Sequence, residues 1–413
     1  MDEARPRRVA VIRPYAALPS EGGANDRYVN LCEQLIALDA APEFFCSDFV
    51  HNSKQRRSAA AIALNQRRLP YLRQIRSFAY RRNLSLARIA HEAWFGLKAF
   101  VRIAAGPRPA VVLIGEPLFL VGWIALLYGF CFRVPVIADL IDLWPEADTA
   151  APRGWRGALR RAAYGGLAAS RGLRLRRYKA VAFASRSYAR LLAPKDANAP
   201  VFYWGSQLAP RRPRAAHSEP IVAIYAGSLG LGYDIETVLA AAAIVRGANA
   251  PLRVAIAGDG PKREAVIRAQ QAGVIDYLGQ LSGGALIDAY EKADIGLLPY
   301  QSSSKVAMPI KFFDYLNFGL YIVSSLTMEA QELIAERAIG ASYLPGDAPD
   351  LAARLIEAAA NRARLARAQA ASKALAAEFA VGAQYRRFAR FVLLPREAGE
   401  GNRPKGGGGG PGG

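Results

Sequence analysis

The chain alternates short apolar runs, bounded by turn residues, with helical stretches, and it does so in two separate rounds. Such alternation is typical of parallel α/β sheets. In the first round we expect strands at Arg8–Pro14, Ala41–Ser47, Ala110–Ile114, Val134–Ile141 and Ala180–Ser185. In the second round we expect them at Ile221–Ala226, Leu252–Ala257, Ile275–Leu278, Ile295–Pro299, Tyr321–Ser325 and Ala341–Leu344.

A polar passage rich in proline and arginine, residues 206–220, separates the two rounds and is typical of an interdomain linker. With 413 residues, 52% of them hydrophobic, the chain can bury two cores. We therefore expect one domain at 1–205 and a second at 221–380. A C-terminal helix at 381–395 can cross back to the first domain. Residues 396–413, ending in GGGGGPGG, are expected to be a disordered tail.

Cysteine usage and hydropathy indicate the cellular compartment in which we expect the protein. The three cysteines, Cys32, Cys46 and Cys131, have no CxxC spacing, which argues against a disulfide framework or a zinc site. The N-terminus lacks the apolar region of a signal peptide. The most apolar stretch, Pro117–Phe132, is shorter than the roughly 20 residues that span a bilayer. It favours a buried helix, with an interfacial or re-entrant segment as the alternative, and a cytoplasmic protein is expected.

The net charge of +20 lies almost entirely in the first half of the chain. Residues 1–205 hold 31 basic against 15 acidic residues, whereas residues 206–413 hold 23 against 19. A basic half can meet nucleic acid, anionic lipid or a phosphorylated substrate. The arginines between Arg153 and Arg177 alternate with apolar residues, which favours an amphipathic surface resting on lipid head groups. A solvated basic face without a partner is the alternative.

Three glycine-marked turns follow expected strand ends, where open α/β sheets bind their ligands. Glycines there let backbone amides approach a phosphate closely. Lys262 and Lys311 add positive charge that would offset a diphosphate, although each can also be a plain surface cation. The turns carry Gly22 and Gly23, then Gly227 and Gly230, then Gly258 and Gly260.

Acidic residues stand at two positions that suit a sugar nucleotide. Asp314 lies early in a helix that follows a polar loop, where a carboxylate can receive ribose hydroxyls. Asp139 and Asp142 end an expected strand and can orient a sugar hydroxyl or act as a base. The alternative for Asp142 is a capping role. His51 follows the second strand and is a candidate acceptor contact. No cluster has metal-ligand spacing, so no metal site is expected.

The order of several motifs resembles glycosyltransferase family 4, whose GT-B fold consists of two facing Rossmann-like domains of doubly wound parallel sheets. The resemblance covers roughly residues 9–391. In the first half it rests on LPSEGGANDRYVNL, residues 49–57, NLSLARI and DLIDLWPEA. In the second half it rests on YAGSLGLGYDIETVLAA, AGDGP, YLGQLSGGALIDAYEKADIGLLPY and MPIKFFDYLNFGLYIVSS.

The resemblance implies a retaining transfer, of the hexosyltransferase type, from a nucleoside diphosphate sugar without a metal or other cofactor. The implied acceptor is a glycan or lipid-linked glycan in cell-envelope polysaccharide synthesis, which would place the enzyme at the inner face of the plasma membrane. A nucleotide-sugar epimerase of the same fold is one alternative. A non-catalytic, basic nucleic-acid-binding or scaffold protein is another. Because no stacking platform for single strands is visible, no nucleic acid partner is expected.

The resemblance also implies roles for single residues. Asp314 takes the place of the second acid of the family's Glu-x7-Glu pair, which holds the ribose, while Val306 stands where the first acid would be. Ser228 stands where the family often has arginine. The resemblance places Gly227, Gly230 and Lys262 at the diphosphate, with Gly22 and Gly23 closing over it. It places Leu278 and Gly279 at the nucleotide base and Asp142 at the reacting centre. The acceptor contacts that we expect are His51 and Arg27.

Overall fold

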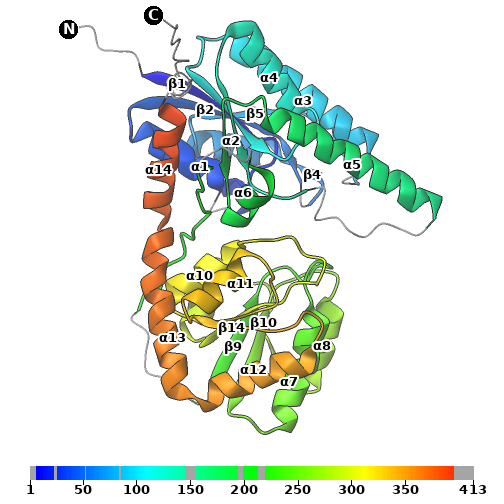
Figure 1. The fold of residues 1–413 in the computed structure, drawn as a ribbon, viewed down its shortest axis with the longest axis vertical. Coiled ribbons are helices and arrows are strands. Elements are labelled where there is room, and N and C mark those ends of the chain that lie inside the picture. The colour runs from blue at the N-terminus through cyan, green and yellow to red at the C-terminus, as the bar shows by residue number, and fades with distance from the viewer. Residues whose placement is uncertain are drawn as a thin grey trace, which may run out of the picture.

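The computed structural model describes residues 6–22, 26–51, 53–82, 85–144, 154–193, 199–212 and 219–394. It forms two α/β domains stacked one above the other, the first running from blue to green and the second from green to orange in Figure 1. Each domain has its own parallel sheet of six strands. The tail that was expected to be disordered lies outside the described residues.

The first sheet has the strand order β5-β2-β1-β6-β7-β8. Counted within the sheet, this is 3-2-1-4-5-6, the order of a Rossmann fold. The strands are β1 (Arg7–Ile12), β2 (Ala40–Ser47), β5 (Leu72–Ile75), β6 (Val111–Glu116), β7 (Val136–Leu140) and β8 (Ala180–Phe183). A small antiparallel hairpin, β3 (Phe49–Val50) and β4 (Gln55–Arg56), follows β2. The sequence did not predict β5, because its two middle residues are polar and only its ends are buried.

Six α-helices connect these strands: α1 (Arg27–Ile36), α2 (Ala59–Arg68), α3 (Leu86–Ala104), α4 (Val121–Phe132), α5 (Trp155–Leu175) and α6 (Arg186–Leu192). A short 3-10 turn, η1 (Pro19–Glu21), precedes α1. The α1 helix begins where the side chain of Asp26 accepts hydrogen bonds from the amides of Tyr28 and Val29. Helices α3, α4 and α5 lie next to one another, away from α1 (Figure 1).

Helix α4 corrects one expectation. The apolar stretch forms a helix between two strands, as predicted, but only one side of it is buried. Val121, Ala125 and Tyr128 pack into the core, whereas Leu127 is 54% and Phe130 84% exposed. Among the described residues, no helix combines the length and the hydropathy needed to cross a membrane.

The second sheet repeats the topology of the first, in the order β11-β10-β9-β12-β13-β14. Its strands are β9 (Ile221–Ala226), β10 (Leu252–Ala257), β11 (Asp276–Tyr277), β12 (Ile295–Leu298), β13 (Tyr321–Ser324) and β14 (Gly340–Ser342). Its helices are α7 (Ile235–Gly247), α8 (Arg263–Gln271), α9 (Gly283–Glu291), α10 (Ile310–Phe318), α11 (Glu329–Glu336), α12 (Ala348–Ala360) and α13 (Arg362–Leu375), followed by the 3-10 turn η2 (Ala376–Phe379). Helices α12 and α13 divide at Asn361, whose side chain caps α13.

The last helix, α14 (Val381–Leu393), leaves the second domain and packs against α1 of the first (Figure 1). Phe388 is fully buried and stacks on Phe202, with 4.7 Å between the ring centroids. Tyr385, Ala389 and Val392 join the same core cluster. The end of the chain's last helix is therefore part of the first domain's core.

The two domains also touch directly, through α6 and α11. The carboxylate of Glu329, at the start of α11, is fully buried. It accepts hydrogen bonds from the backbone amide and Nε of Arg186, both at 2.6 Å, and from the hydroxyl of Tyr203 at 2.5 Å. Glu329 of the second domain thus caps the start of α6 in the first domain, so this contact holds the two domains together at α6 and α11.

The packing of α14 makes a prediction about stability. Phe388→Ala should lower the free energy of unfolding by about 3–5 kcal/mol, since it removes a fully buried ring. Urea denaturation followed by circular dichroism measures this change. The matched control is Phe130→Ala, at an exposed ring, where the change should stay within about 0.5 kcal/mol. Equal losses in both variants would contradict this account of α14.

Candidate functional site

Each sheet reverses its strand order at one point, between β1 and β6 in the first domain and between β9 and β12 in the second. In doubly wound sheets, ligands bind outside the carboxyl ends of the strands at this switch point. Each domain has a hollow beyond the carboxyl ends of its central strands. The two hollows are described separately below.

The hollow of the second domain, here called the glycine pocket, has a volume of about 330 Å³. It opens where β9 and β10 end. Its lining residues are Ala226, Gly227, Ser228, Ala257, Gly258, Asp259, Gln280, Leu281 and Leu286. Two of the three glycine turns that the sequence marked therefore meet at one place.

Glycine is required at this meeting point. A Cβ atom on Gly258 would lie 1.7 Å from the carbonyl oxygen of Gly227, and one on Gly260 would lie 2.8 Å from the carbonyl carbon of Leu229. Both Gly258 and Gly260 also have positive φ angles, 145° and 151°. The backbones of the two turns thus touch, with no side chain of either glycine between them. Their amides are used within the protein: that of Gly227 donates to the carbonyl of Ala257 at 2.9 Å, and that of Gly258 donates to the carbonyl of Gly279 at 2.7 Å.

Lys311, near the start of α10, brings a positive charge to the glycine pocket. Its Nζ would lie 2.4 Å from a Cβ atom on Gly227, and it sits 4.8 Å from the ring centroid of Tyr233. In the described part of the chain, no carboxylate lies within ion-pair distance of this ammonium group. A cation beside glycine turns at the carboxyl ends of parallel strands is a favourable environment for a phosphate.

The hollow of the first domain, here called the cleft pocket, has a volume of about 490 Å³ and includes residues of both domains. The second domain contributes Ile310 from α10, and the linker contributes Trp204. The other lining residues are Arg13, Tyr15, Ala16, Ala17, Glu21, Asp26, Val50, His51, Arg88, Pro117, Ile141, Asp142 and Trp144. Asp142 and His51, two of the expected site residues, therefore line one space.

The imidazole of His51 is neutral in this environment. Burial, followed by the charges of Lys54, Arg88 and Arg13, lowers the pKa of His51 to about 3. Its Nδ1 shares a hydrogen bond of 2.5 Å with the hydroxyl of Tyr80. Asp142 is exposed, and its Oδ1 accepts from the amide of Leu143 at 2.7 Å.

Comparisons with known proteins agree with this geometry. Residues 220–361 match the family model "Glycosyl transferases group 1", which covers most of the second domain and none of the first. No curated protein sequence matches the chain.

Among solved structures, sucrose-phosphate synthase from Thermosynechococcus elongatus superposes with a TM-score of 0.64 at 16% identity, over 94% of this chain and 99% of that one. HepE from Anabaena, in complex with UDP-glucose, gives 0.63 at 12% identity, over 94% and 99%. WaaG, a glycosyltransferase involved in lipopolysaccharide biosynthesis, gives 0.59 at 11%, over 93% and 99%. The fold is GT-B. This confirms the fold class that the sequence predicted.

Two expected residues of the first GT-B domain are placed in its core and not in a pocket. The guanidinium of Arg27 pairs with the carboxylate of Asp139, at 2.6 and 2.9 Å, and Tyr28 donates to the same carboxylate at 3.0 Å. Arg27 and Asp139 are both fully buried. This corrects the expectation that Asp139 takes part in catalysis and Arg27 in acceptor binding, because the pair links α1 to β7 with no access to a substrate.

Lys262 is a second correction. Its Nζ donates to the carbonyl of Tyr233 and to the carboxylate of Glu236, both at 2.6 Å. The ammonium group of Lys262 is therefore paired with Glu236 of α7 and does not face the glycine pocket. Of the other expected contacts, Gly230 is next to Ser228: a Cβ atom on Gly230 would lie 3.0 Å from the Oγ of Ser228. Leu278 is 41% exposed.

Gly22 ends the η1 turn with φ 69°, while Gly23 lies outside the described residues.

Asp314 lies in α10, three positions after Lys311, and is 6% exposed. Its Oδ1 accepts a hydrogen bond from the hydroxyl of Ser206 in the linker. Burial raises the pKa of Asp314 to about 6, while Ser206 and Lys311 act in the opposite direction. In this structure its partner is the linker, so a ribose contact stays a prediction that requires Ser206 to give way.

Sequence reasoning missed several residues that line the cleft pocket. Arg13 directly follows the first strand, and Trp144 belongs to the DLIDLW motif, so strand position was the available signal for both. Arg88 and Trp204 come from a helix and from the linker. Nothing local marks them, because only the packing of distant segments brings them to this space.

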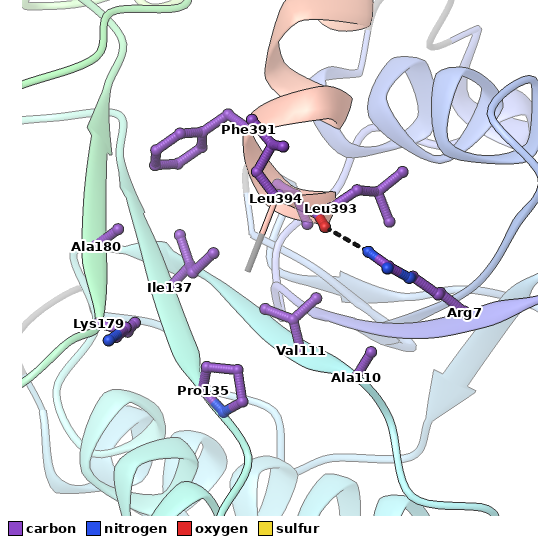
Figure 2. A pocket seen from close by; sticks show the side chains of 11 residues that line it. Arg7, Ala110, Val111, Pro135, Ile137, Lys179, Ala180, Phe391, Leu393 and Leu394 are labelled. Atoms are coloured by element: carbon purple, nitrogen blue, oxygen red, sulfur yellow. Dashed lines mark hydrogen bonds between the residues drawn. The ribbon is translucent and has the colours of Figure 1, made fainter. Parts of the chain in front are cut away.

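A further hollow, of about 170 Å³, lies at the opposite edge of the first sheet, near the amino ends of β6 and β7. Figure 2 shows its mostly apolar wall and the hydrogen bond of 2.9 Å from Arg7 Nη1 to the carbonyl of Leu393. Its position at the amino ends of the strands and its lack of acids make it a poor candidate for chemistry. In the described part of the chain, no group of histidine, cysteine and acidic side chains could hold a metal.

The environment of Asp314 predicts a pH dependence of stability. Its folded pKa of about 6 exceeds the ordinary 3.8, so the folded state binds this proton more tightly than the unfolded chain does. The free energy of unfolding should therefore fall by about 3 kcal/mol as the pH rises from about 3 to about 7, through this group alone. Asp314→Asn removes that contribution.

Urea denaturation of the wild type and of Asp314→Asn, at steps across this pH range, measures the effect as a difference between the two proteins. The wild type should lose stability relative to the variant as the pH rises. A difference that stays constant across the range would show that Asp314 is not buried as described.

Proposed function

We propose that this protein is a retaining glycosyltransferase that moves a sugar from a nucleoside diphosphate sugar to a glycan or lipid-linked acceptor. One observation carries the proposal. In the second domain of a GT-B fold, within the segment that matches the group 1 model, the touching backbones of Gly227 and Gly258 and the ammonium of Lys311 meet at the carboxyl ends of β9 and β10.

In this proposal the glycine pocket holds the donor. HepE, which has the same fold, is described in complex with UDP-glucose, which supports a nucleotide sugar as the ligand of the corresponding space here. Lys311 stabilises the charge that develops on the departing diphosphate, and electrostatic stabilisation of this kind is the main source of rate enhancement. The base rests near Leu278 and Gly279, and the ribose reaches Asp314.

The acceptor enters the cleft pocket, where Asp142 lies closest to the reacting centre. The hydroxyl oxygen of the acceptor forms the new glycosidic bond. The bond from the donor sugar to the diphosphate breaks on the same face of the sugar. The leaving phosphate takes the acceptor's proton, so no strong side-chain base is needed. The neutral His51 contacts the acceptor. WaaG, a similar structure, takes part in lipopolysaccharide biosynthesis, which supports a role in making the cell envelope.

The first domain has a surface that suits the membrane side of this proposal. Helices α3, α4 and α5 carry exposed apolar side chains at spacings that place them on one side of each helix: Leu97 and Val101 on α3, Leu127 and Phe130 on α4, Trp155 and Leu159 on α5. Arg161 of α5, and Arg176 and Arg177 just after this helix, are exposed, and residues 1–205 carry most of the excess positive charge. We propose that these helices rest on anionic head groups at the inner face of the membrane.

The donor site can be tested with a thermal-shift panel of UDP-, GDP- and dTDP-sugars. At least one should stabilise the wild type, and Lys311→Met should bind it about tenfold or more weakly, since a charge-assisted contact to phosphate is lost. Asp314→Ala should bind more weakly too. The matched control is Lys292→Met, an exposed lysine of the same domain.

Two results would contradict the donor site. One is a wild type that no nucleotide sugar stabilises. The other is a Lys311→Met variant that binds as the wild type does. With a labelled donor, transfer to an acceptor supports the transferase, whereas an isomerised free nucleotide sugar would favour an epimerase of the same fold.

The membrane surface can be tested by co-sedimentation with vesicles. The wild type should bind vesicles that contain anionic lipid and release at high salt. Leu127→Ser with Phe130→Ser should weaken binding by about tenfold or more, because two apolar side chains no longer enter the head-group region. Leu344→Ser, an exposed leucine of the second domain, should bind as the wild type does. Stronger binding to RNA than to vesicles would contradict the proposal.

A further inference from the structure

Positively charged groups gather on the first-domain side of the cleft pocket. The guanidinium carbons of Arg13 and Arg88 lie 5.8 and 5.6 Å from the ring centroid of one residue, Tyr15. The Nζ of Lys54 lies 4.8 Å from the ring centroid of Tyr80, whose hydroxyl is bonded to His51. Three cations therefore surround one small group of aromatic rings.

The acidic groups nearby compensate these cations unequally. Glu92 is fully buried and accepts from Arg88 Nε at 3.1 Å, so Arg88 has its own counter-ion. Glu21 is paired with Arg57, outside this group. The carboxylate of Asp26 accepts from the amides of Tyr28 and Val29 at the start of α1 and from the amide of Ala17 before it. Asp142 is the remaining acid that lines the pocket.

Arg13 stands apart from this pairing. Its Nη1 donates to the carbonyl of Gly115 at 2.9 Å, while its Nε is buried without a hydrogen-bond partner. Within the described ranges, no carboxylate lies at ion-pair distance from it. A buried guanidinium N–H without a partner is costly, and such a group is normally satisfied by an anion or by water.

His51 reports the resulting electrostatic field. After burial, the causes that lower its pKa to about 3 are Lys54, Arg88, Arg13 and His91, and none acts in the opposite direction. Burial, followed by Arg88, also lowers the pKa of Lys54 to about 8. Crowded positive charges of this kind are stabilised when a negative group binds between them.

The pocket wall also carries three large aromatic side chains, Tyr15, Trp144 and Trp204, beside several aliphatic ones. Apolar and aromatic side chains of this kind suit the faces of a sugar ring. A ligand that matches both halves of the pocket is a sugar that carries a negative group.

We propose that the cleft pocket recognises a carboxylate or a phosphate on the acceptor sugar, with Arg13, which lines the pocket, as the principal contact. Lys54 is not part of the lining and adds positive charge from the neighbouring aromatic group. This inference rests on the proposed function and names the class of its acceptor.

The experiment compares the binding of glucose, glucuronate, glucose 6-phosphate and inorganic phosphate to the full chain, by calorimetric titration. At least one charged sugar should bind about tenfold or more tightly than glucose, and Arg13→Gln should remove that advantage. Tighter binding of glucuronate assigns a carboxylate, and tighter binding of glucose 6-phosphate than of free phosphate assigns a sugar phosphate.

Three variants keep the outcome decisive. Lys54→Gln tests the same preference should Arg13→Gln fail to fold, and it should weaken the charged sugar as well. Arg108→Gln removes an exposed arginine of the same domain and should have no effect. Lys311→Met, in the other domain, should leave the preference intact, which excludes binding at the glycine pocket.

The inference is overturned if glucose binds as well as both charged sugars, if free phosphate binds as well as glucose 6-phosphate while glucuronate shows no advantage, or if Arg13→Gln and Lys54→Gln both retain the wild-type preference. These results leave the donor site untouched. Failure of the proposed function has a different signature, since it would appear as the absence of any nucleotide-sugar binding.

Discussion

One buried ion pair joins the parts of this molecule that are far apart in the sequence. The guanidinium of Arg27 is held by Asp139 at 2.6 Å and lies 5.0 Å from the ring of Phe388 and 5.6 Å from that of Trp204. It thereby connects α1, β7, the linker and the returning helix α14. Removing one partner of such a pair leaves a buried charge without compensation, which typically costs about 3–5 kcal/mol. The position of the second domain relative to the first depends on this junction.

With the junction in place, the carboxyl ends of the central strands of the two domains border one interdomain space. The glycine pocket requires the carbonyl of Gly227 to pack against Gly258, a contact that any side chain at position 258 would prevent. The cleft pocket requires Trp204 and Ile310 to complete a wall that the first domain builds only in part. The glycine pocket therefore depends on local turns within one domain, whereas the cleft pocket depends on the arrangement of the domains.

In the proposed function, Lys311 stands on the donor side of this space and Arg13 on the acceptor side. The buried acids Asp139, Glu92 and Asp314 all have partners of their own. In the described part of the chain, no carboxylate lies within ion-pair distance of Lys311 or Arg13, so their charges are available to the two partners that the proposal brings together.

The sequence by itself determined the two α/β domains and the place of the glycine turns. Buried strands such as β9 and β10 consist of short apolar runs, which can be recognised without the structure. It did not decide which charges are buried in the core. Asp139 and Asp142 stand three positions apart in one motif, yet one is a core ion pair and the other faces the cleft pocket. Arg13 and Arg88 meet at Tyr15 although 75 positions separate them. Only the tertiary structure decides such pairings, since they arise from the packing of distant segments, which leaves no periodic signal in the chain.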